Sequence, residues 1–150
     1  MKTKFRLAGK ADRELLIHHF NHYRNKVFQE KRVDCFIEHN YSLLMFVDEH
    51  FIGIIQWYVK EDPGLGVVEF EELFIRDSFR NKGMGTQLVK KALLEIEKKI
   101  HPLHSVFLFI DRKDEVTQHI FCKFKFKKVA EIPDLFKSDE TVLLYLKTFS

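Results

Sequence analysis

The sequence predicts an α/β (α+β) fold, in which a central mixed β-sheet of about seven strands is combined with four helices. Two segments carry this prediction. The apolar and acidic segment Val67–Ile75 predicts a strand, and a glycine-containing turn joins it to an amphipathic helix that runs to about Ile100. The continuous apolar run Ser105–Ile110 is typical of a strand buried on both faces. Because strand–helix–strand units are right-handed, these two strands should be parallel neighbours.

The first third of the chain predicts one short strand and two helices. Lys4–Leu7 is the strand, and Asp12 is a candidate cap for the first helix. Residues suited to a buried face recur at helical spacing after this cap: Leu15, Leu16, His19, Phe20 and Tyr23. A second helix is expected over about Phe28–His39, with an apolar face made of Phe28, Val33, Phe36 and Ile37.

A hairpin and a third antiparallel strand follow these helices. Tyr41–Val47 and Phe51–Lys60 are the strands of the hairpin, and Asp48–His50 is the tight turn between them. The turn residues of Glu61–Gly66 lead into Val67–Ile75, which should therefore run antiparallel to the strand before it.

The rest of the chain completes the order β-α-α-β-β-β-α-β-α-β-β. The helix after the glycine turn has a regular apolar face, made of Leu88, Val89, Ala92, Leu93, Ile96 and Ile100. Pro102 stops this helix. Asp114 can cap a last helix from Glu115 to about Phe124, and Phe126–Ile132 with Thr141–Lys147 forms a closing hairpin. No repeat or linker interrupts the pattern, so residues 1–150 are expected to form a single domain.

Composition limits the classes of function. The net charge of +3 suits an anionic ligand but is too weak to indicate a nucleic-acid partner. Cys35 and Cys122 fit neither a disulfide framework nor a zinc site, so free thiols in a cytoplasmic protein are expected. No window predicts a membrane span or a signal peptide. The cluster of His18, His19 and His22 lacks a further ligand at suitable spacing, so no metal site is predicted.

The segment Arg80–Thr86 carries the strongest functional signal. Gly83 and Gly85 stand between a strand and a helix, where they let the backbone pass close to a ligand. The first turn of the helix presents unpaired N–H groups and the positive end of its dipole, which favour a phosphate or pyrophosphate. Leu88 stands where a dinucleotide-binding loop has its third glycine, and no G-K-[ST] ending is present, so neither motif applies. The simpler alternative is a solvated turn in which glycine supplies a positive φ.

This segment resembles the acyl-CoA signature [RQ]-x-x-G-x-[GA] of the GCN5-related N-acetyltransferase (GNAT) family. Arg80, Gly83 and Gly85 fill its three defined positions. The predicted order of elements is also similar to that of the GNAT fold over essentially the whole chain. The resemblance implies an acetyl-CoA-dependent N-acetyltransferase that moves an acetyl group to a primary amine of a small molecule or peptide. By family analogy it also allows a homodimer.

The resemblance implies a set of CoA-binding residues. The strand before the glycine loop should diverge from its parallel neighbour, so that the pantetheine arm lies between them and contacts the backbone of Leu73, Phe74 and Ile75. The pyrophosphate should lie on the loop, which consists of Arg80, Asn81, Lys82, Gly83, Met84, Gly85 and Thr86.

Two residues of the last helix fall at further family positions. The pattern N-x-x-A-x-x-x-Y aligns with Asp114, Thr117 and Phe121, and the resemblance places Asp114 and Phe121 beside the cofactor. Phe121 stands where many family members have the tyrosine that protonates the departing thiolate. Arg112 or Lys113 could reach the adenosine 3′-phosphate, and a solvated charged loop is the alternative for both.

Three glutamates of Val67–Ile75 are candidates for the general base, because an amine of ordinary basicity must lose a proton before it can attack. The resemblance ranks Glu69 first, then Glu72, which lies nearest the thioester end, and then Glu71. Strand alternation puts Glu69 and Glu71 on one face and Glu72 on the other, unless a β-bulge changes the faces.

The acceptor is less well defined by the sequence. Acidic residues near the closing hairpin, Asp134, Asp139 and Glu140, favour a cationic amine such as a polyamine, an aminoglycoside or a lysine side chain. The alternative to an enzyme is a GNAT-like module that binds an acyl-CoA as a sensor or has lost catalysis, in keeping with Phe121.

Overall fold

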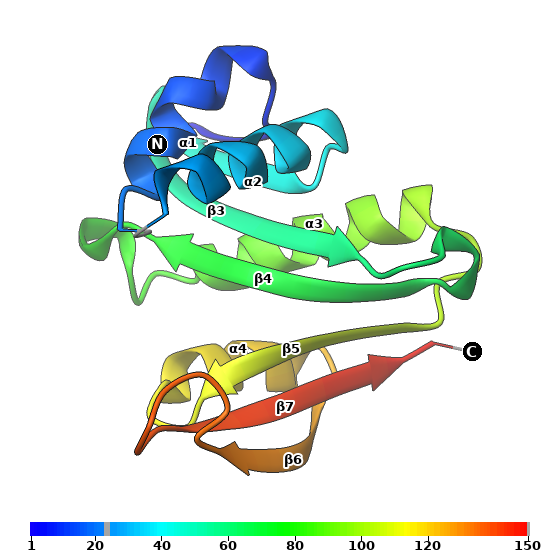
Figure 1. Ribbon diagram of the computed structural model, residues 1–150. Coiled ribbons are helices and arrows are strands. Elements are labelled where there is room, and N and C mark those ends of the chain that lie inside the picture. The colour runs from blue at the N-terminus through cyan, green and yellow to red at the C-terminus, as the bar shows by residue number, and fades with distance from the viewer. Residues whose placement is uncertain (23–24, 150) are drawn as a thin grey trace.

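The computed structural model of the chain describes residues 1–22 and 25–149 (Figure 1). Within these residues, one sheet contains seven strands in the order β1-β2-β3-β4-β5-β7-β6, and four α-helices pack on it. The strands are β1 Thr3–Leu7, β2 Ser42–Val47, β3 His50–Val59, β4 Val67–Ile75, β5 Ser105–Asp111, β6 Lys127–Pro133 and β7 Thr141–Thr148. The helices are α1 Arg13–His19, α2 Lys26–Glu38, α3 Met84–Lys99 and α4 Glu115–Lys123. The predicted mixed fold and its order of elements are confirmed.

The sheet is mixed because one pair of neighbours is parallel. β1 to β4 run antiparallel to one another in sequence order, β4 and β5 are parallel, and β7 lies antiparallel between β5 and β6. The helix α3 is the crossover between the parallel strands, as the βαβ argument predicted.

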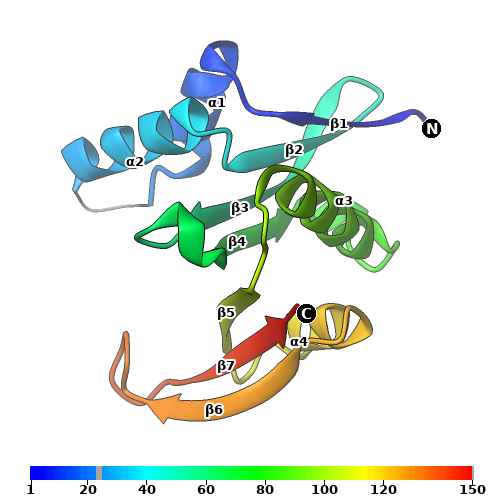
Figure 2. The ribbon, with the colours of Figure 1, turned by 90° about the vertical axis from the view of Figure 1, so that its right-hand side faces the viewer.

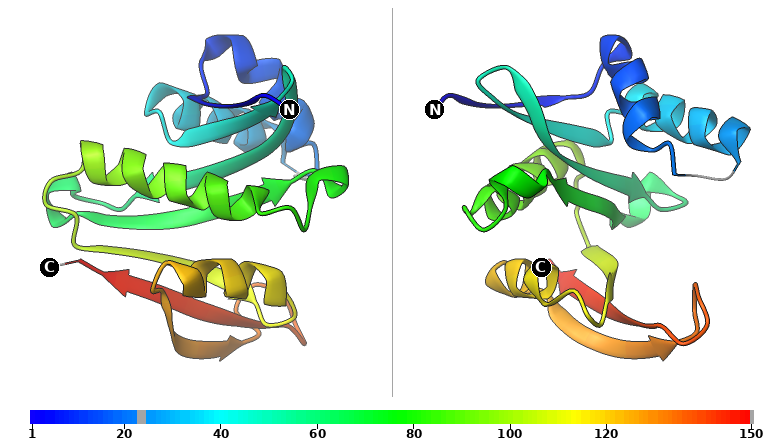
Figure 3. Two further views of the ribbon diagram at one scale, coloured as in Figure 1. Left: turned by 180° about the vertical axis from the view of Figure 1, so that it is seen from behind. Right: turned by 90° about the vertical axis from the view of Figure 1, so that its left-hand side faces the viewer.

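The helices cover both faces of the sheet. Figure 2 and the right-hand view of Figure 3 show α1 and α2 on one face and α3 and α4 on the other. The larger hydrophobic cluster includes Leu88 of α3 and Phe121 of α4, and the smaller one includes Leu16 of α1 and Val33 of α2. β4 lies between these two layers, so successive side chains of this strand face different helices.

The turn between β2 and β3 is tighter than the sequence predicted. Asp48 and Glu49 have φ values of 47° and 71°, and His50 is already the first residue of β3. Two central residues with positive φ are the mark of a type I′ hairpin turn, whose twist matches that of the flanking strands.

The start of α1 differs from the prediction. Asp12 occupies the N-cap position, but its carboxylate makes no capping hydrogen bond. It accepts two hydrogen bonds from the Arg6 guanidinium, at 2.6 and 2.8 Å, and one from the Gly9 N–H at 2.8 Å. The hydrogen bond from Arg6 holds the pKa of Asp12 below its ordinary value of 3.8. Asp12 therefore ties β1 to α1.

Two expectations for the buried faces of α1 and α2 also change. α1 ends at His19, so Phe20 packs in the core just beyond the helix, and Tyr23 lies outside the described residues. α2 begins at Lys26, after Asn25 has capped it by accepting the Phe28 N–H at 2.9 Å. The side chain of Phe28 is 51% exposed and does not belong to the buried face.

Candidate functional site

The two parallel strands at the centre of the sheet separate along their length. β4 pairs with β5 through Val67, Val68 and Glu69. From there to Ile75 β4 stays paired with β3, while β5 stays paired with β7, so the strands diverge toward their carboxyl ends (Figure 1). Within the described residues, the edge of β4 beyond Glu69 has no strand partner on the β5 side. Its backbone groups can therefore bind an extended ligand.

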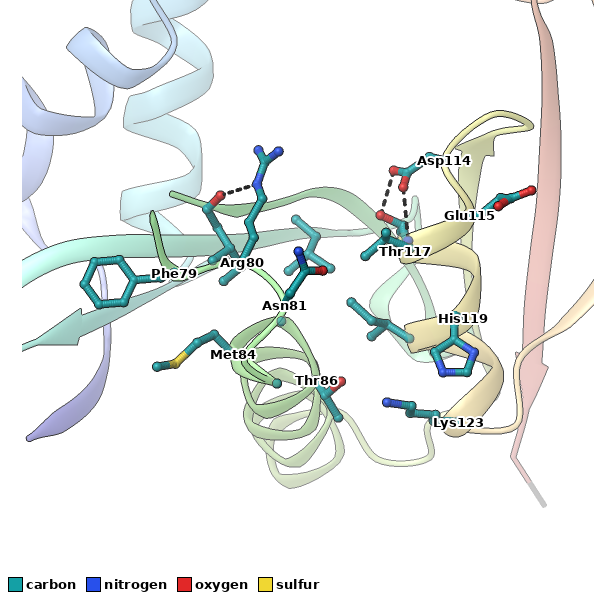
Figure 4. A pocket seen from close by; sticks show the side chains of 16 residues that line it. Phe79, Arg80, Asn81, Met84, Thr86, Asp114, Glu115, Thr117, His119 and Lys123 are labelled. Atoms are coloured by element: carbon teal, nitrogen blue, oxygen red, sulfur yellow. Dashed lines mark hydrogen bonds between the residues drawn. The ribbon is translucent and has the colours of Figure 1, made fainter. Parts of the chain in front are cut away.

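An open pocket of about 920 Å³ lies where this gap meets the start of α3. Figure 4 shows it between the loop that precedes α3 and the helix α4. Its lining comes from β4 (Leu73, Ile75), from the loop and first turn of α3 (Phe79, Arg80, Asn81, Gly83, Met84, Gly85, Thr86) and from α4 and its cap (Asp114, Glu115, Val116, Thr117, His119, Ile120, Lys123). This volume is large enough for a ligand of cofactor size.

The loop before α3 has a backbone suited to an anion. Asn81 and Gly83 have positive φ values of 61° and 76°, and Gly83 is the N-cap of α3. A Cβ at position 83 would meet nothing within 4 Å, so the backbone conformation favours glycine here, and lack of space does not. The first N–H groups of α3, on Met84, Gly85 and Thr86, have no acceptor inside the helix and belong to residues that line the pocket.

Gly85 serves a different purpose from Gly83. A Cβ at position 85 would lie 3.0 Å from Ile120 Cδ1 and 3.8 Å from Ile75 Cγ1. The missing side chain therefore lets the first turn of α3 approach both α4 and the end of β4. Both glycines of the predicted motif have a structural reason, and the reasons are independent.

The structure divides the basic residues of the loop. Arg80 lines the pocket, and its Nε–H donates to the carbonyl oxygen of Ile75 at 2.9 Å. Its guanidinium also lies 3.1 Å from a carboxylate oxygen of Asp77, so Arg80 fixes the loop to the end of β4. Lys82 is not among the residues that line the pocket, and its Nζ lies 5.6 Å from the centre of the Phe79 ring.

The side chain of Phe74 is on the opposite face of β4 from the pocket. It packs against the smaller cluster, and its ring centre lies 4.6 Å from that of His19. The prediction for Phe74 concerned its backbone, which runs along the gap between Leu73 and Ile75. These two neighbours do line the pocket.

One face of α4 lines the pocket more fully than the sequence analysis foresaw. Asp114 caps the helix by accepting hydrogen bonds from the Thr117 N–H at 3.0 Å and the Thr117 hydroxyl at 2.6 Å. His119 and Lys123 lie on the side of α4 that faces the start of α3 (Figure 4). Their spacing of four residues places them on one helix face, a signal that could have identified them. The proposed phosphate contacts Arg112 and Lys113 line neither of the two hollows described here.

Phe121 has a core position that the sequence analysis did not foresee. Its side chain is 0% exposed, and its ring centre lies 5.6 Å from that of Phe70 and 5.1 Å from that of Phe126. Phe121 borders the gap between β4 and β5, but its side chain is not accessible to solvent. The expected contact between Phe121 and the cofactor stays a prediction.

A β-bulge places the three glutamates of β4 on the same face. The pairing with β3 shifts at this point, so that Glu71 is left between the paired residues Phe70 and Glu72. The carboxylates of Glu71 and Glu72 then lie near Arg32 of α2 and His19 of α1. Simple alternation, which put Glu72 on the other face, is corrected by this bulge.

Two of the three glutamates have fixed cationic partners. The carboxylate of Glu69 lies 2.9 Å from Lys60 Nζ, and this hydrogen bond raises the pKa of Lys60. The carboxylate of Glu71 lies 3.2 Å from a guanidinium nitrogen of Arg32. Both ion pairs join side chains that are well under half exposed, so solvent screens them only in part.

Glu72 has a titratable partner instead. One of its carboxylate oxygens lies 3.7 Å from His19 Nε2. Glu72 Oε2 and His19 Nε2 are both buried, and neither has a hydrogen-bond partner in the described part of the chain. The His19 ring is held between aromatic neighbours, with ring centres 4.7 Å from Phe20 and 5.9 Å from Phe51. Glu72 thus has its Oε1 beside an imidazole that aromatic rings surround, and its Oε2 is buried without a hydrogen-bond partner.

A second, smaller hollow connects these acids to the gap. It has a volume of about 240 Å³ and is lined by Phe70, Glu71, Glu72, Leu73, Leu108, Phe109, Ile110, Asp111, Asp114, Thr117 and Phe121. Glu69 lines neither hollow, because it lies where β4 and β5 are still paired. The structure therefore brings Glu71 and Glu72 to the gap and leaves Glu69 outside it.

Residues 1–22 and 25–149 contain no group of three or more His, Cys, Asp or Glu side chains arranged to hold a metal ion. Over the same residues, no helix is both long enough and apolar enough to cross a bilayer. Cys35 and Cys122 are both free thiols.

No curated protein sequence matches the chain. Its fold is similar to an N-acetyltransferase from Staphylococcus aureus (TM-score 0.81, 16% identity, 99% of each chain covered) and to a GNAT-family acetyltransferase from Streptococcus pneumoniae (TM-score 0.82, 15% identity, 99% and 100% covered). It is also similar to yncA from Salmonella typhimurium, determined with its cofactor acetyl-CoA (TM-score 0.78, 16% identity, 99% and 94% covered). The model of the acetyltransferase (GNAT) family matches residues 11–126. The chain therefore belongs to the GNAT acetyltransferase family.

Proposed function

We propose that this protein is an acetyl-CoA-dependent N-acetyltransferase that acetylates a primary amine of a small molecule or peptide, with Glu72 as its general base. The observation that carries the proposal is the buried, unpaired oxygen of Glu72 at the point where β4 leaves β5. A family member with a pocket for the cofactor and a free carboxylate at the adjoining gap has the parts that amine acetylation requires.

The residues of the larger pocket fit acetyl-CoA. Three backbone N–H groups at the start of α3 and the positive end of its dipole suit a pyrophosphate. His119 and Lys123 supply further donors from α4, and Arg80 keeps the loop in place. The unpaired edge of β4 near Leu73 suits the amide groups of a pantetheine arm, which would lie along it like a strand.

Glu72 is favoured over the other two glutamates because of its surroundings. A carboxylate held by a fixed cation is a weaker proton acceptor, since the cation favours its charged form. Glu69 is paired with Lys60, and Glu71 is paired with Arg32. Glu72 lies in the gap and has an imidazole neighbour at 3.7 Å. The sequence analysis ranked Glu69 first, and the geometry favours Glu72.

The proton balance of the reaction follows from this assignment. The acceptor arrives as an ammonium, and Glu72 takes one proton from it, directly or through a water molecule. Bound acetyl-CoA supplies an acetyl group activated as a thioester, which the neutral amine attacks directly. A backbone N–H near Leu73 stabilises the negative charge that develops on the thioester oxygen. As the bond between carbon and sulfur breaks, the attacking nitrogen would lose one proton and the departing sulfur would take up one, so that the products are the amide and the free thiol of CoA.

Thiol release from acetyl-CoA tests this function directly. The purified chain is mixed with acetyl-CoA and a panel of primary amines, and free thiol is measured over time. Calorimetry with CoA on the same preparation reports binding without catalysis. We expect CoA binding together with thiol release that depends on the amine, and a mass increase of one acetyl group on the acceptor.

The outcomes separate the alternatives. CoA binding with no amine-dependent thiol release would contradict the enzyme proposal and favour a module that senses an acyl-CoA. Absence of both CoA binding and thiol release would contradict the cofactor assignment as well.

A further inference from the structure

The strand β5 carries an aromatic face that the core does not use. Val106, Leu108 and Ile110 belong to the large cluster beneath α3 and α4. Phe107 and Phe109 alternate with them and so point to the other face of the sheet, the one that carries α1 and α2. Their ring centres lie 6.1 Å apart, and both rings are partly exposed.

The loop between β6 and β7 adds another ring on this side. Figure 2 and the right-hand view of Figure 3 show the loop on the same face of the sheet as α1 and α2. Phe136 of this loop is 67% exposed, yet its ring centre lies 5.6 Å from that of Phe109 in an edge-to-face arrangement. Phe109 also lines the hollow that contains Glu72. Aromatic rings from two separate elements therefore meet beside the proposed base.

The acids of this hollow differ in the partners of their carboxylates. Glu71 is paired with Arg32. Asp111 accepts the N–H of Lys113 at 2.8 Å, and Asp114 caps α4. Among the described carboxylates, Glu72 is the one with a buried oxygen that lacks a hydrogen-bond partner. This one buried oxygen can bind one ammonium group, and the rings beside it offer an apolar contact to the rest of the acceptor.

We propose that Phe109 and Phe136 form the apolar wall of the acceptor site, and that the acceptor is an amine with one ammonium group on an apolar or aromatic body. The ammonium binds Glu72, and the body of the molecule packs against the two rings. This inference rests on the proposed function and narrows its acceptor. It also narrows the cationic amines that the acidic residues of the closing hairpin favoured. Of these residues, Asp134 accepts the N–H of Asp139 at 2.8 Å inside its own exposed loop.

Three amines of graded character test this inference. Phenethylamine has one ammonium and an aromatic body, ethylamine has the ammonium alone, and spermidine has several charges. We expect kcat/KM for phenethylamine to exceed that for each of the other two by about ten-fold or more, through a lower KM.

Phe136→Ser removes one ring from the wall without disturbing the core, since the side chain is largely exposed. We expect kcat/KM for phenethylamine to fall roughly 3- to 10-fold, as for the loss of one aromatic contact. The value for ethylamine and the KM for acetyl-CoA should stay unchanged. Val129→Ser is the matched control, because Val129 is 53% exposed on β6 and is not among the residues that line either hollow. It should leave all three amines unaffected.

The failure of this inference differs from the failure of the proposed function. Two results would contradict the aromatic wall and leave the proposed enzyme activity intact. The first is that wild type acetylates amines but prefers spermidine. The second is that Phe136→Ser lowers the rates for phenethylamine and ethylamine equally. If no amine in the panel releases thiol, calorimetry still tests the aromatic wall, because it measures the affinity of phenethylamine for the complex of the protein with CoA. The aromatic wall would be contradicted if wild type and Phe136→Ser bound phenethylamine with equal affinity, or if neither bound it.

Discussion

The two faces of β4 are built in different ways. On the side of α3 and α4, the strand offers apolar side chains and an unpaired edge, and the neighbouring loop offers backbone N–H groups. On the side of α1 and α2, three carboxylates meet Lys60, Arg32 and His19. The first face binds through the backbone, whereas the second acts through side chains. In the proposed function, the first face binds acetyl-CoA and the second binds the acceptor.

Binding through the backbone can be predicted from a short sequence motif, whereas binding through side chains of several elements cannot. Gly83 needs a positive φ and Gly85 needs a close approach, so both requirements appear as glycine in a short motif. The face that carries α1 and α2, here called the acceptor face, takes its groups from α1, α2, the residue after β3, β4, β5 and the loop between β6 and β7. No local pattern joins them.

The largest effect is expected on CoA binding, at the face of β4 that carries α3 and α4, here called the cofactor face. Gly85→Glu should lower CoA affinity by roughly 100-fold or more, because a carboxylate would enter the anion site at the positive end of α3. Calorimetry measures the affinity, and circular dichroism confirms that the variant is folded.

Gly85→Ala is the matched control for this change. Its Cβ would lie 3.0 Å from the end of the flexible Ile120 side chain, which can shift by a few tenths of an ångström. The affinity for CoA should fall far less than with glutamate. If folded Gly85→Glu protein bound CoA with wild-type affinity, the assignment of CoA binding to this face would be contradicted.

How much of the site could be predicted depends on the element concerned. The strand Val67–Ile75 was predicted with its bounds, and the glycine segment was predicted in its place, although α3 already begins at Met84. An apolar run and two glycines are local signals. Asp12 was predicted as a cap, but its carboxylate binds Arg6 from β1 instead, a contact that depends on the tertiary fold.

The bulge at Glu71 shows the limit most clearly. Alternation in a regular strand puts Glu71 and Glu72 on opposite faces, and one extra residue in β4 reverses that result. The pairing of β3 with β4 decides whether a bulge forms, and the sequence of β4 alone does not contain it. Likewise, His19 was assigned to an apolar helix face, and only the folded chain brings it 3.7 Å from Glu72.

A stability measurement examines how the acceptor face is held together. Asp12 is 6% exposed and joins Arg6 of β1 to the start of α1. Asp12→Asn should lower the free energy of unfolding by about 1–3 kcal/mol at neutral pH, since it removes a charge-assisted pair from a buried position. Denaturant unfolding with and without CoA checks this, and CoA affinity should not change.

The pH dependence of this effect has a definite sign. The pKa of Asp12 is lower in the folded protein than its ordinary value of 3.8. Its contribution is therefore complete above that value and is lost as the pH falls through the lower, folded pKa. The difference between wild type and Asp12→Asn should shrink below about pH 4. A difference that persists unchanged in strong acid would contradict the ion-pair explanation.

A smaller effect is expected at the imidazole beside the proposed base. His19→Asn should lower kcat roughly 3- to 10-fold, or about 1 kcal/mol, because it removes the ring that lies beside the Glu72 carboxylate. The KM for acetyl-CoA should be unchanged. His18→Asn changes the exposed neighbouring histidine and serves as the control. If both variants lower kcat equally, the contact between His19 and Glu72 does not contribute to catalysis.

No effect is expected at an ion pair far from both faces of the gap. Lys128 and Glu131 lie 2.9 Å apart on β6, and this hydrogen bond lowers the pKa of Glu131. Because both side chains are about half exposed, solvent screens the pair. Glu131→Gln should leave the melting temperature, CoA affinity and amine-dependent thiol release unchanged. A change in thiol release would extend the acceptor face to β6.

The central claim is that the acceptor face supplies the base and the cofactor face does not, and steady-state kinetics of three variants tests it most directly. Glu72→Gln, Glu71→Gln and Glu69→Gln are compared by thiol release with one amine acceptor across a range of pH. We predict that Glu72→Gln lowers kcat by roughly 10²-fold with an unchanged KM for acetyl-CoA, and that Glu69→Gln has a much smaller effect. Wild-type kcat in Glu72→Gln over the whole pH range would contradict the account.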